Sequence, residues 1–221
     1  MPDQPASGSI QPLPDPIVRQ PRSAEEAMAK ARQRIARTAD ARAGGWEALA
    51  ALVSEPDEVL IDGLRDGTVA LMLREATEWL GPDSSMVLAP LMSLETHARG
   101  AGRRSHGDDL ARLRQDHADL LADGPDLAGP MRELAGLCHR EAQAWSRGDD
   151  EDGKALRARQ RERVDSVLGQ TLPPVATSLA QDGMASLTRS VGRMLLGFLS
   201  AETGRDYLRA ALGDPRSRSR R

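Results

Sequence analysis

The residues best suited to chemistry are one cysteine, four histidines and a short acidic run. Cys138 is followed directly by His139, and residues 149–152 are all acidic. A thiol beside an imidazole suggests nucleophilic catalysis or a metal site, and clustered carboxylates suggest a divalent cation. Consecutive residues on a helix point about 100° apart, so Cys138 and His139 do not converge on one metal ion without other ligands.

The spacing of these residues completes no familiar catalytic or metal motif. The histidines do not form a zincin-like pair, and the acidic run lacks the spacing of a calcium loop; the histidines are His97, His106, His117 and His139. The sequence contains neither G-x-x-x-x-G-K-[ST] nor G-x-S-x-G. Cys138 lies on an apolar stripe, as expected of a small core residue. We therefore predict a protein that is not an enzyme, with no catalytic residue, no metal site and no cofactor. A hydrolytic or metal enzyme is the least favoured alternative.

The segments that carry these residues are predicted to be helices. Between Met131 and Leu199, apolar residues recur at three- and four-residue steps in four successive segments. Residues 148–153 separate the first two segments, and their acids suit the positive N-terminus of the second helix. Pro173-Pro174 is expected to end the second helix and begin the third. The first stripe is Met131, Leu134, Leu137, Cys138, Ala142 and Trp145; the last is Met184, Leu187, Val191, Leu195 and Phe198, beside Met194 and Leu199.

The N-terminal half also has the pattern of helices. Ser23 is predicted to begin the folded part through a capping box with Glu26. Gly44-Gly45 is expected to interrupt that helix. Ser54 is expected to cap the next one, which ends at Gly67. Further helices are predicted over residues 86–98 and from residue 108 to 125.

Composition favours one helical domain without nucleic-acid binding. The 221 residues suit a single domain, and 30 basic against 33 acidic residues leave a net charge of −3, which argues against a general nucleic-acid binder. Only 2% of residues are aromatic, so the core must consist of aliphatic side chains, which suit helices. The basic run at residues 30–37 is expected to be a solvated helix face because no aromatic residues interleave with it.

The sequence also predicts the domain boundaries and the cellular compartment of the protein. Residues 1–22 are rich in proline and are predicted to be a disordered leader; residues 23–212 form the helical domain, and residues 213–221 a basic, disordered tail. One cysteine fits a reducing compartment. No apolar run approaches the roughly 20 residues of a membrane span, and the N-terminus lacks the order of a secretory signal. We predict a cytoplasmic protein with no integral membrane segment.

Two stretches resemble a known chaperone family. Residues 133–149 read E-L-A-G-L-C-x-x-E-A-x-A-W-x-x-G-D and are followed by A-R-Q, L-P-P and an apolar helix ending F-L-x-x-E. Residues 113–125 read L-R-Q-D-H-A-D-L-L-A-D-G-P. This order is similar to the TorD/DmsD/NarJ family, whose second motif is L-R-x-D-Y-x-x-L-F-x-G-P. The resemblance implies an all-α, single-domain bundle of the TorD-like type, which matures molybdenum enzymes of the dimethyl-sulfoxide-reductase type.

The resemblance also implies a partner and a site. The partner would be the catalytic subunit of such a molybdoenzyme, bound before export through its twin-arginine leader or N-terminal segment during cofactor insertion. The chaperone itself would be a monomer or a homodimer. An apolar client segment would lie between helices, with carboxylates near the client arginines. The candidate client-binding residues are Arg114, Asp116, His117, Leu120, Leu121, Gly124 and Pro125, with Glu133 and Glu141 as acidic neighbours. Asp116 and His117 are the pair on which this site depends most.

One departure from the family supports a different reading. Members carry an E-P-x-D-H motif after the Gly-Pro pair, whereas this chain passes from Gly124-Pro125 through residues 126–130 directly into the next helix. The alternative is a helical regulatory or scaffolding protein that keeps the fold and has lost leader binding.

Overall fold

The computed structural model describes most of the predicted helical domain. The described residues are 23–79, 124–183 and 186–212, with positions 87, 90–92, 111, 114–115, 117–119 and 121 between the first two ranges. The predicted leader, the predicted tail, and most of the helices expected over 86–98 and 108–125 lie outside the described residues.

Every described element is helical. The elements are α1 (Ala24–Val53), α2 (Glu58–Asp66), α3 (Thr68–Thr77), α6 (Ala128–Arg147), α7 (Asp150–Arg163), the π-helical turn η2 (Val164–Leu168), α8 (Gly169–Asp182), α9 (Ser186–Thr203) and α10 (Tyr207–Leu212). No strand occurs in the part of the chain that the structure describes. The predicted all-α, single-domain fold is therefore confirmed.

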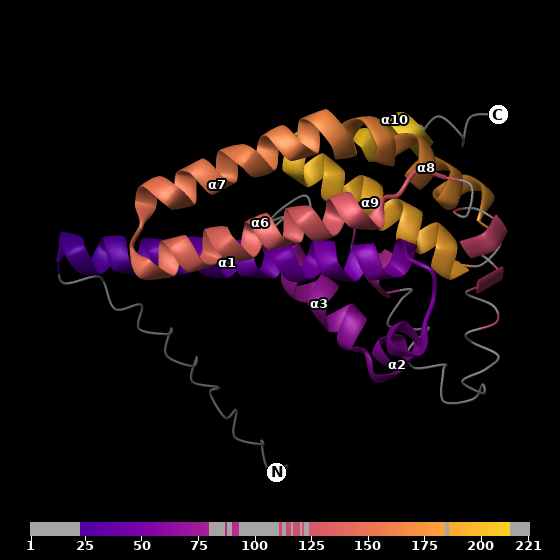
Figure 1. Ribbon diagram of the computed structural model, residues 1–221, viewed down its shortest axis with the longest axis horizontal. Helices are drawn as coiled ribbons and strands as arrows, with labels where there is room; N and C mark the ends of the chain where they lie inside the picture. Colours follow the sequence, from indigo (N-terminus) through magenta and orange to yellow (C-terminus); the bar gives the residue numbers. More distant parts are fainter. Residues whose placement is uncertain are drawn as a thin grey trace, which may run out of the picture.

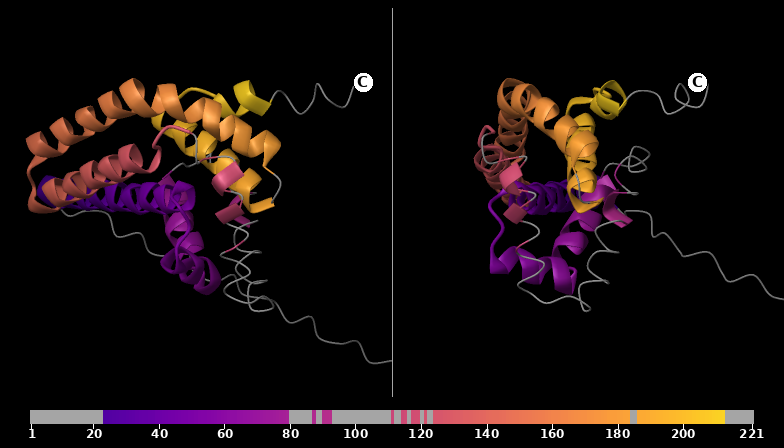
Figure 2. Two further views of the ribbon diagram at one scale, coloured as in Figure 1. Left: turned by 45° about the vertical axis from the view of Figure 1, so that its right-hand side comes forward. Right: turned by 90° about the vertical axis from the view of Figure 1, so that its right-hand side faces the viewer.

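Two long rods form the framework of the bundle (Figure 1). The first is α1, which packs along α6 and against α3. The second consists of α7, η2 and α8, which follow one another without a break. Helix α9 returns along α8 and reaches α1, so it closes the bundle between the two rods (Figure 2). Helices α1 and α7 therefore run in the same direction, and α6 runs between them in the opposite direction.

One helix start follows its predicted cap, and another falls at the predicted acidic run. The Ser23 hydroxyl accepts a hydrogen bond from the Glu26 amide at 3.1 Å and begins α1. Helix α6 ends at Gly148, whose φ of 77° suits glycine. The Asp149 side chain then accepts from the Asp152 amide at 3.1 Å and begins α7, with acidic residues in its first turn. Each of these caps satisfies a backbone amide that would otherwise be unpaired, and Ser23 is the one predicted from the sequence.

Gly44-Gly45 does not interrupt α1, contrary to the prediction. The helix continues through both glycines to Val53. A Cβ atom on Gly45 would lie 2.5 Å from the Ala76 Cβ and 2.7 Å from the Phe198 ring. The glycine therefore lets α3 and α9 approach the backbone of α1, and their packing offsets its low helix propensity.

The sequence predicts that Ser54 begins a helix. In the structure, Ser54 instead ends α1. Its amide donates to the carbonyl oxygens of Ala50 and Ala51, so it is the C-cap of α1. Asp57 begins α2, because its Oδ1 accepts from the Leu60 amide at 2.8 Å. A carboxylate at this position also suits the positive end of the helix. Gly67 ends α2 as predicted, with a φ of 86°.

Pro173-Pro174 also does not end one helix and begin the next, contrary to the prediction. Both prolines lie inside α8, which continues from the π-helical turn η2. Proline removes a backbone donor from the helix interior, at a cost of about 3 kcal/mol. Pro174 and Gln170 lie on the exposed side, where water can satisfy the carbonyl that loses its donor. The buried side chains of Leu172 and Ala176 hold the helix against the core across this point.

The predicted apolar stripes form the core. On α6 the buried members are Met131, Leu134, Leu137, Cys138 and Ala142, and on α9 they are Leu187, Val191, Met194, Leu195, Phe198 and Leu199. Trp46 of α1 meets Phe198 edge to face, with ring centroids 5.8 Å apart. Among the described helices, none has the length and apolar character needed to span a membrane.

Candidate functional site

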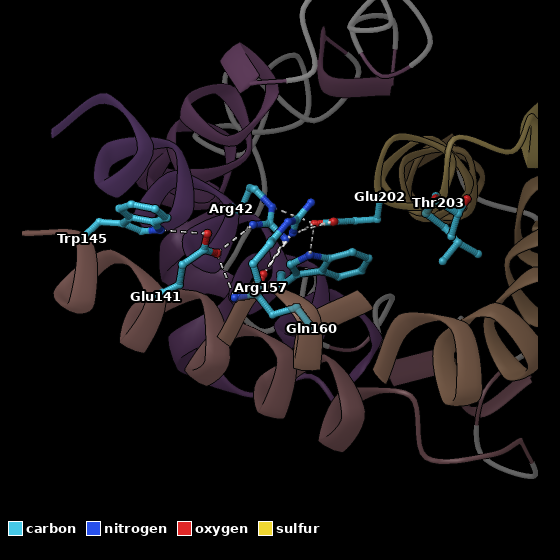
Figure 3. Close-up of polar contacts among 9 residues, drawn as sticks. Arg42, Glu141, Trp145, Arg157, Gln160, Glu202 and Thr203 are labelled. Atoms are coloured by element: carbon cyan, nitrogen blue, oxygen red, sulfur yellow. Dashed lines mark hydrogen bonds and ion pairs between the residues drawn. The ribbon is translucent and has the colours of Figure 1, made fainter. Parts of the chain in front are cut away.

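A network of buried polar side chains lies where α1, α6, α7 and α9 meet (Figure 3). Its centre is Arg42 of α1, only 3% exposed. Small residues, including Ala39 and Ala43, let the neighbouring helices approach α1 closely here. Arg42 donates to Gln160 Oε1 of α7 at 2.9 Å and to Glu141 Oε2 of α6 at 3.3 Å. One guanidinium group thus joins three helices.

The network is neutral within itself. Glu202 of α9 accepts from Arg42 Nε at 2.8 Å, from Arg157 Nη1 at 3.1 Å and from Trp46 Nε1 at 3.3 Å. Gln160 Nε2 donates to Glu141 at 2.9 Å. Two arginines therefore balance two glutamates, as buried charges require. Burial is the largest single effect on the pKa of Arg42 and lowers it. The negative charges around the guanidinium group, that of Glu202 first, together outweigh burial and hold that pKa above its usual value.

A cationic pocket opens beside this network, and we call it the basic pocket. Its volume is about 540 Å³. Its lining residues are Arg34, Ile35, Thr38, Ala39 and Arg42 of α1, Trp79 after α3, Glu141 and Trp145 of α6, and Lys154, Arg157, Ala158 and Arg161 of α7. Arg42 lies over the Trp79 ring, 5.4 Å from its centroid, and the Trp145 Nε1 donates to Glu141 at 3.4 Å.

Two polar bridges connect α1 with α7 beside the basic pocket. The first is the double hydrogen bond from Arg32 to Asp150, at 2.6 and 2.9 Å. The second is the bond from Arg42 to Gln160. The bridges are ten residues apart on both helices, which corresponds to about 15 Å along each axis. Most of the pocket lining from α1 and α7 falls between them along the chain, and Arg161 lies one residue beyond the second bridge.

Cys138 and His139 point to different environments. Cys138 is buried beside the network, and burial raises the pKa of its thiol to about 12, so the thiol keeps its proton at neutral pH. His139 lies at the surface, with its ring nitrogens 3.0 Å from Asp40 Oδ1 and 3.1 Å from Glu47 Oε1. The two side chains do not share a site. Within the described ranges, no group of three metal-ligating side chains is arranged to hold an ion.

Two of the predicted client-binding residues line a second, apolar pocket. His117 and Leu121 lie there beside residues of α2, α8, α9 and the end of α1, in a depression of about 30 Å³ that we call the apolar notch. Its other lining residues are Leu52, Pro56, Leu60, Leu179, Leu187, Thr188 and Val191. Arg114 Nε donates to the Pro56 carbonyl oxygen at 3.3 Å and so ties this segment to the connection between α1 and α2.

The other predicted residues are placed differently. Gly124 and Pro125 are exposed, and the Gly124 amide donates to the Leu121 carbonyl at 3.0 Å. Glu133 is exposed and pairs with Arg163, whereas Glu141 lines the basic pocket and not the apolar notch. Asp116 and Leu120 lie outside the described residues.

Sequence reasoning missed the buried polar network, although a signal for it exists. Arg42 falls among the small and apolar positions of α1, and Glu202 follows Phe198 by one helical turn. Likewise Gln160 lies midway between Leu156 and Val164, which are both buried. Polar residues on apolar stripes of different helices are expected to pair with one another, because burying them singly is costly.

Comparison with protein families, with curated proteins and with solved structures finds no match for this chain. The resemblance to the TorD/DmsD/NarJ family therefore stays a prediction from the sequence motifs.

Proposed function

We propose that this protein is a cytoplasmic chaperone that binds an apolar segment of a partner polypeptide at the apolar notch. The partner suggested by the sequence motifs is the catalytic subunit of a dimethyl-sulfoxide-reductase-type molybdoenzyme before export. The observation that carries the proposal is the position of His117 and Leu121. Both belong to the segment that resembles the family's second motif, and both line the notch.

The notch has room for only a small apolar anchor, about the size of a methyl group, because its volume is about 30 Å³. Its walls are mostly leucine and valine from α2, α8, α9 and the end of α1, so an apolar group of the client would be removed from water there. His117 is half-buried and supplies a polar group next to this apolar surface. A client helix or extended segment would insert one residue and lie across the surrounding surface, as amphipathic segments do in grooves.

A specific observation favours the second candidate, a regulatory or scaffolding protein without leader binding. The carboxylates expected to hold client arginines already pair with arginines of the chain itself. Glu133 pairs with Arg163, and Glu141 pairs with Arg42 inside the buried network. Such a protein would use the notch for a partner that carries no twin-arginine motif.

The two candidates differ in what the notch captures. We would immobilise the full chain and measure binding of a synthetic twin-arginine leader peptide by surface plasmon resonance. A co-purification with the molybdoenzyme catalytic subunit would run in parallel. The chaperone proposal expects both to bind, and expects Asp116→Ala together with His117→Ala to weaken each about tenfold. Binding of neither the leader peptide nor the catalytic subunit would favour the second candidate.

A matched control lies on the same segment. Gln115 and Asp119 are exposed and hydrogen-bond to each other at 3.0 Å, and neither lines the notch. The double variant Gln115→Ala with Asp119→Ala should bind like the unaltered chain. Equal capture by all three proteins would remove the notch from the proposal.

A further inference from the structure

The basic pocket carries more positive charge than its own carboxylates balance. Five of its lining side chains are cationic and one is acidic. Arg42 and Arg157 are neutralised by Glu141 and Glu202 of the buried network. The remaining cations, Arg34, Lys154 and Arg161, therefore give the pocket a net positive charge.

Two of these cations have no partner within the described part of the chain. Arg34 of α1 and Arg161 of α7 are exposed, and no hydrogen bond or ion pair joins their guanidinium groups to another described residue. Lys154 lies 3.5 Å from Glu151, but both side chains are exposed, and such surface pairs contribute little. The donors of Arg34 and Arg161 are thus available to a ligand.

The pocket combines this charge with an apolar surface and a volume suited to a small molecule. Trp145, Ile35 and Trp79 are all half-buried in its lining, and Arg42 lies over the Trp79 ring. Its volume of about 540 Å³ falls in the range of about 300–1,000 Å³ that is usual for small-molecule sites.

We propose that the basic pocket binds a small phosphate-bearing molecule that also has a ring or another apolar group. Arginine presents a planar fork of donors that matches phosphate oxygens two at a time, so Arg34 of α1 and Arg161 of α7 would each bind phosphate oxygens of the ligand. Lys154 adds a third positive charge at the α7 side. The ring would lie against Trp145 and Ile35. The buried network below holds Arg42 and Arg157 in place and makes the pocket floor rigid.

This ligand site is independent of the proposed client site. The basic pocket and the apolar notch share no lining residue. The cations of the basic pocket would also repel a twin-arginine segment. Loss of anion binding in a variant therefore leaves the client proposal untouched, and the reverse also holds.

Isothermal titration calorimetry on the full chain tests the proposal with three probes. ATP carries phosphates and a ring, inorganic pyrophosphate carries phosphates alone, and adenosine carries the ring alone. We expect ATP to bind with a Kd below about 1 mM, pyrophosphate to bind more weakly, and adenosine to show no heat of binding. An absence of binding by both ATP and pyrophosphate overturns the proposal. Binding of a glutamate-rich peptide in their place also overturns it and identifies an acidic protein partner.

Charge-reversal variants locate the site. Arg34→Glu with Arg161→Glu changes two exposed residues of the pocket lining and should weaken ATP binding about tenfold or more. Arg37→Glu with Arg159→Glu makes the same change in net charge on the same two helices, outside the pocket lining. This control should bind ATP nearly as well as the unaltered chain. Equal weakening in both double variants would mean that overall charge attracts the anion, and the pocket would be excluded.

Discussion

Arg42 Nη2 donates a hydrogen bond of 2.9 Å to Gln160 Oε1, across 118 residues of sequence. The bond joins α1 to α7, and the same guanidinium group also pairs with Glu141 and Glu202. Four helices therefore depend on one side chain for their polar contacts. Arg42, Glu141 and Arg157 of this network also line the basic pocket. Loss of the Arg42 contacts should therefore change the shape of the pocket.

Removal of Arg42 should destabilise the fold strongly. Arg42→Ala leaves Glu141 and part of the Glu202 carboxylate buried without a positive partner, which costs about 3–5 kcal/mol in free energy of unfolding. Urea unfolding followed by circular dichroism measures this loss. Arg37→Ala, on an exposed position of the same helix, should change stability by less than about 0.5 kcal/mol. Similar values for the two variants would show that the network contributes little.

The two adjacent glycines of α1 should respond in opposite ways to alanine. The Gly45 Cβ would lie 2.5 Å from the Ala76 Cβ, so Gly45→Ala should cost about 1–3 kcal/mol through overpacking. At Gly44 the nearest atom, Met72 Cε, is 3.9 Å away. Gly44→Ala should stabilise the helix by up to about 1 kcal/mol, because alanine has the higher helix propensity. Thermal unfolding of both variants gives the comparison, and stabilisation by both would contradict the close packing at Gly45.

The helical class was predictable because periodicity is a local property of the sequence. The α9 stripe of Leu187, Val191, Leu195 and Phe198 predicts a buried face, and the caps at Ser23 and Asp149 lie within a few residues of the amides they satisfy. The sequence predicts helix ends at Gly45 and Pro173 because glycine and proline have low helix propensity. Tertiary packing decides both positions: at Gly45 through Phe198, and near Pro173 through buried Leu172.

The candidate sites were predictable only in part, because pockets combine residues that are distant in sequence. Motif resemblance identified the segment containing His117 and Leu121, and these residues do line the apolar notch. The same resemblance grouped Glu141 with them, whereas Arg42 holds that carboxylate at the basic pocket. No local pattern relates Arg34 to Arg161, which are brought to one pocket only when α7 packs beside α1.

Alkaline pH should destabilise the fold partly through Cys138. Burial raises the pKa of its thiol to about 12, whereas an unfolded cysteine titrates near 8.5. Between these values the folded chain holds a proton that the unfolded chain has released, so stability falls as pH rises. This contribution reaches about 1.4 kcal/mol per pH unit. Cys138→Ala should show a shallower loss of unfolding free energy from about pH 9 to 11. Parallel curves for the two proteins would show that Cys138 does not contribute.

Acidic pH should weaken the Arg32–Asp150 bridge beside the basic pocket. The hydrogen bonds from Arg32 hold the pKa of Asp150 below its usual value. A lowered carboxyl pKa stabilises the fold above about pH 4, and this stabilisation is lost as pH falls through the folded-state pKa. Asp150→Asn removes the carboxylate and should therefore make stability less sensitive to acid in this range.

Glu151→Gln, the next residue of the same first turn, is the matched control because its partner Lys154 belongs to α7 itself. Hydrogen exchange across residues 30–34 and 150–154 should be faster in Asp150→Asn than in Glu151→Gln at pH 7. Equal exchange in the two variants would mean that Arg32 does not hold α7 against α1.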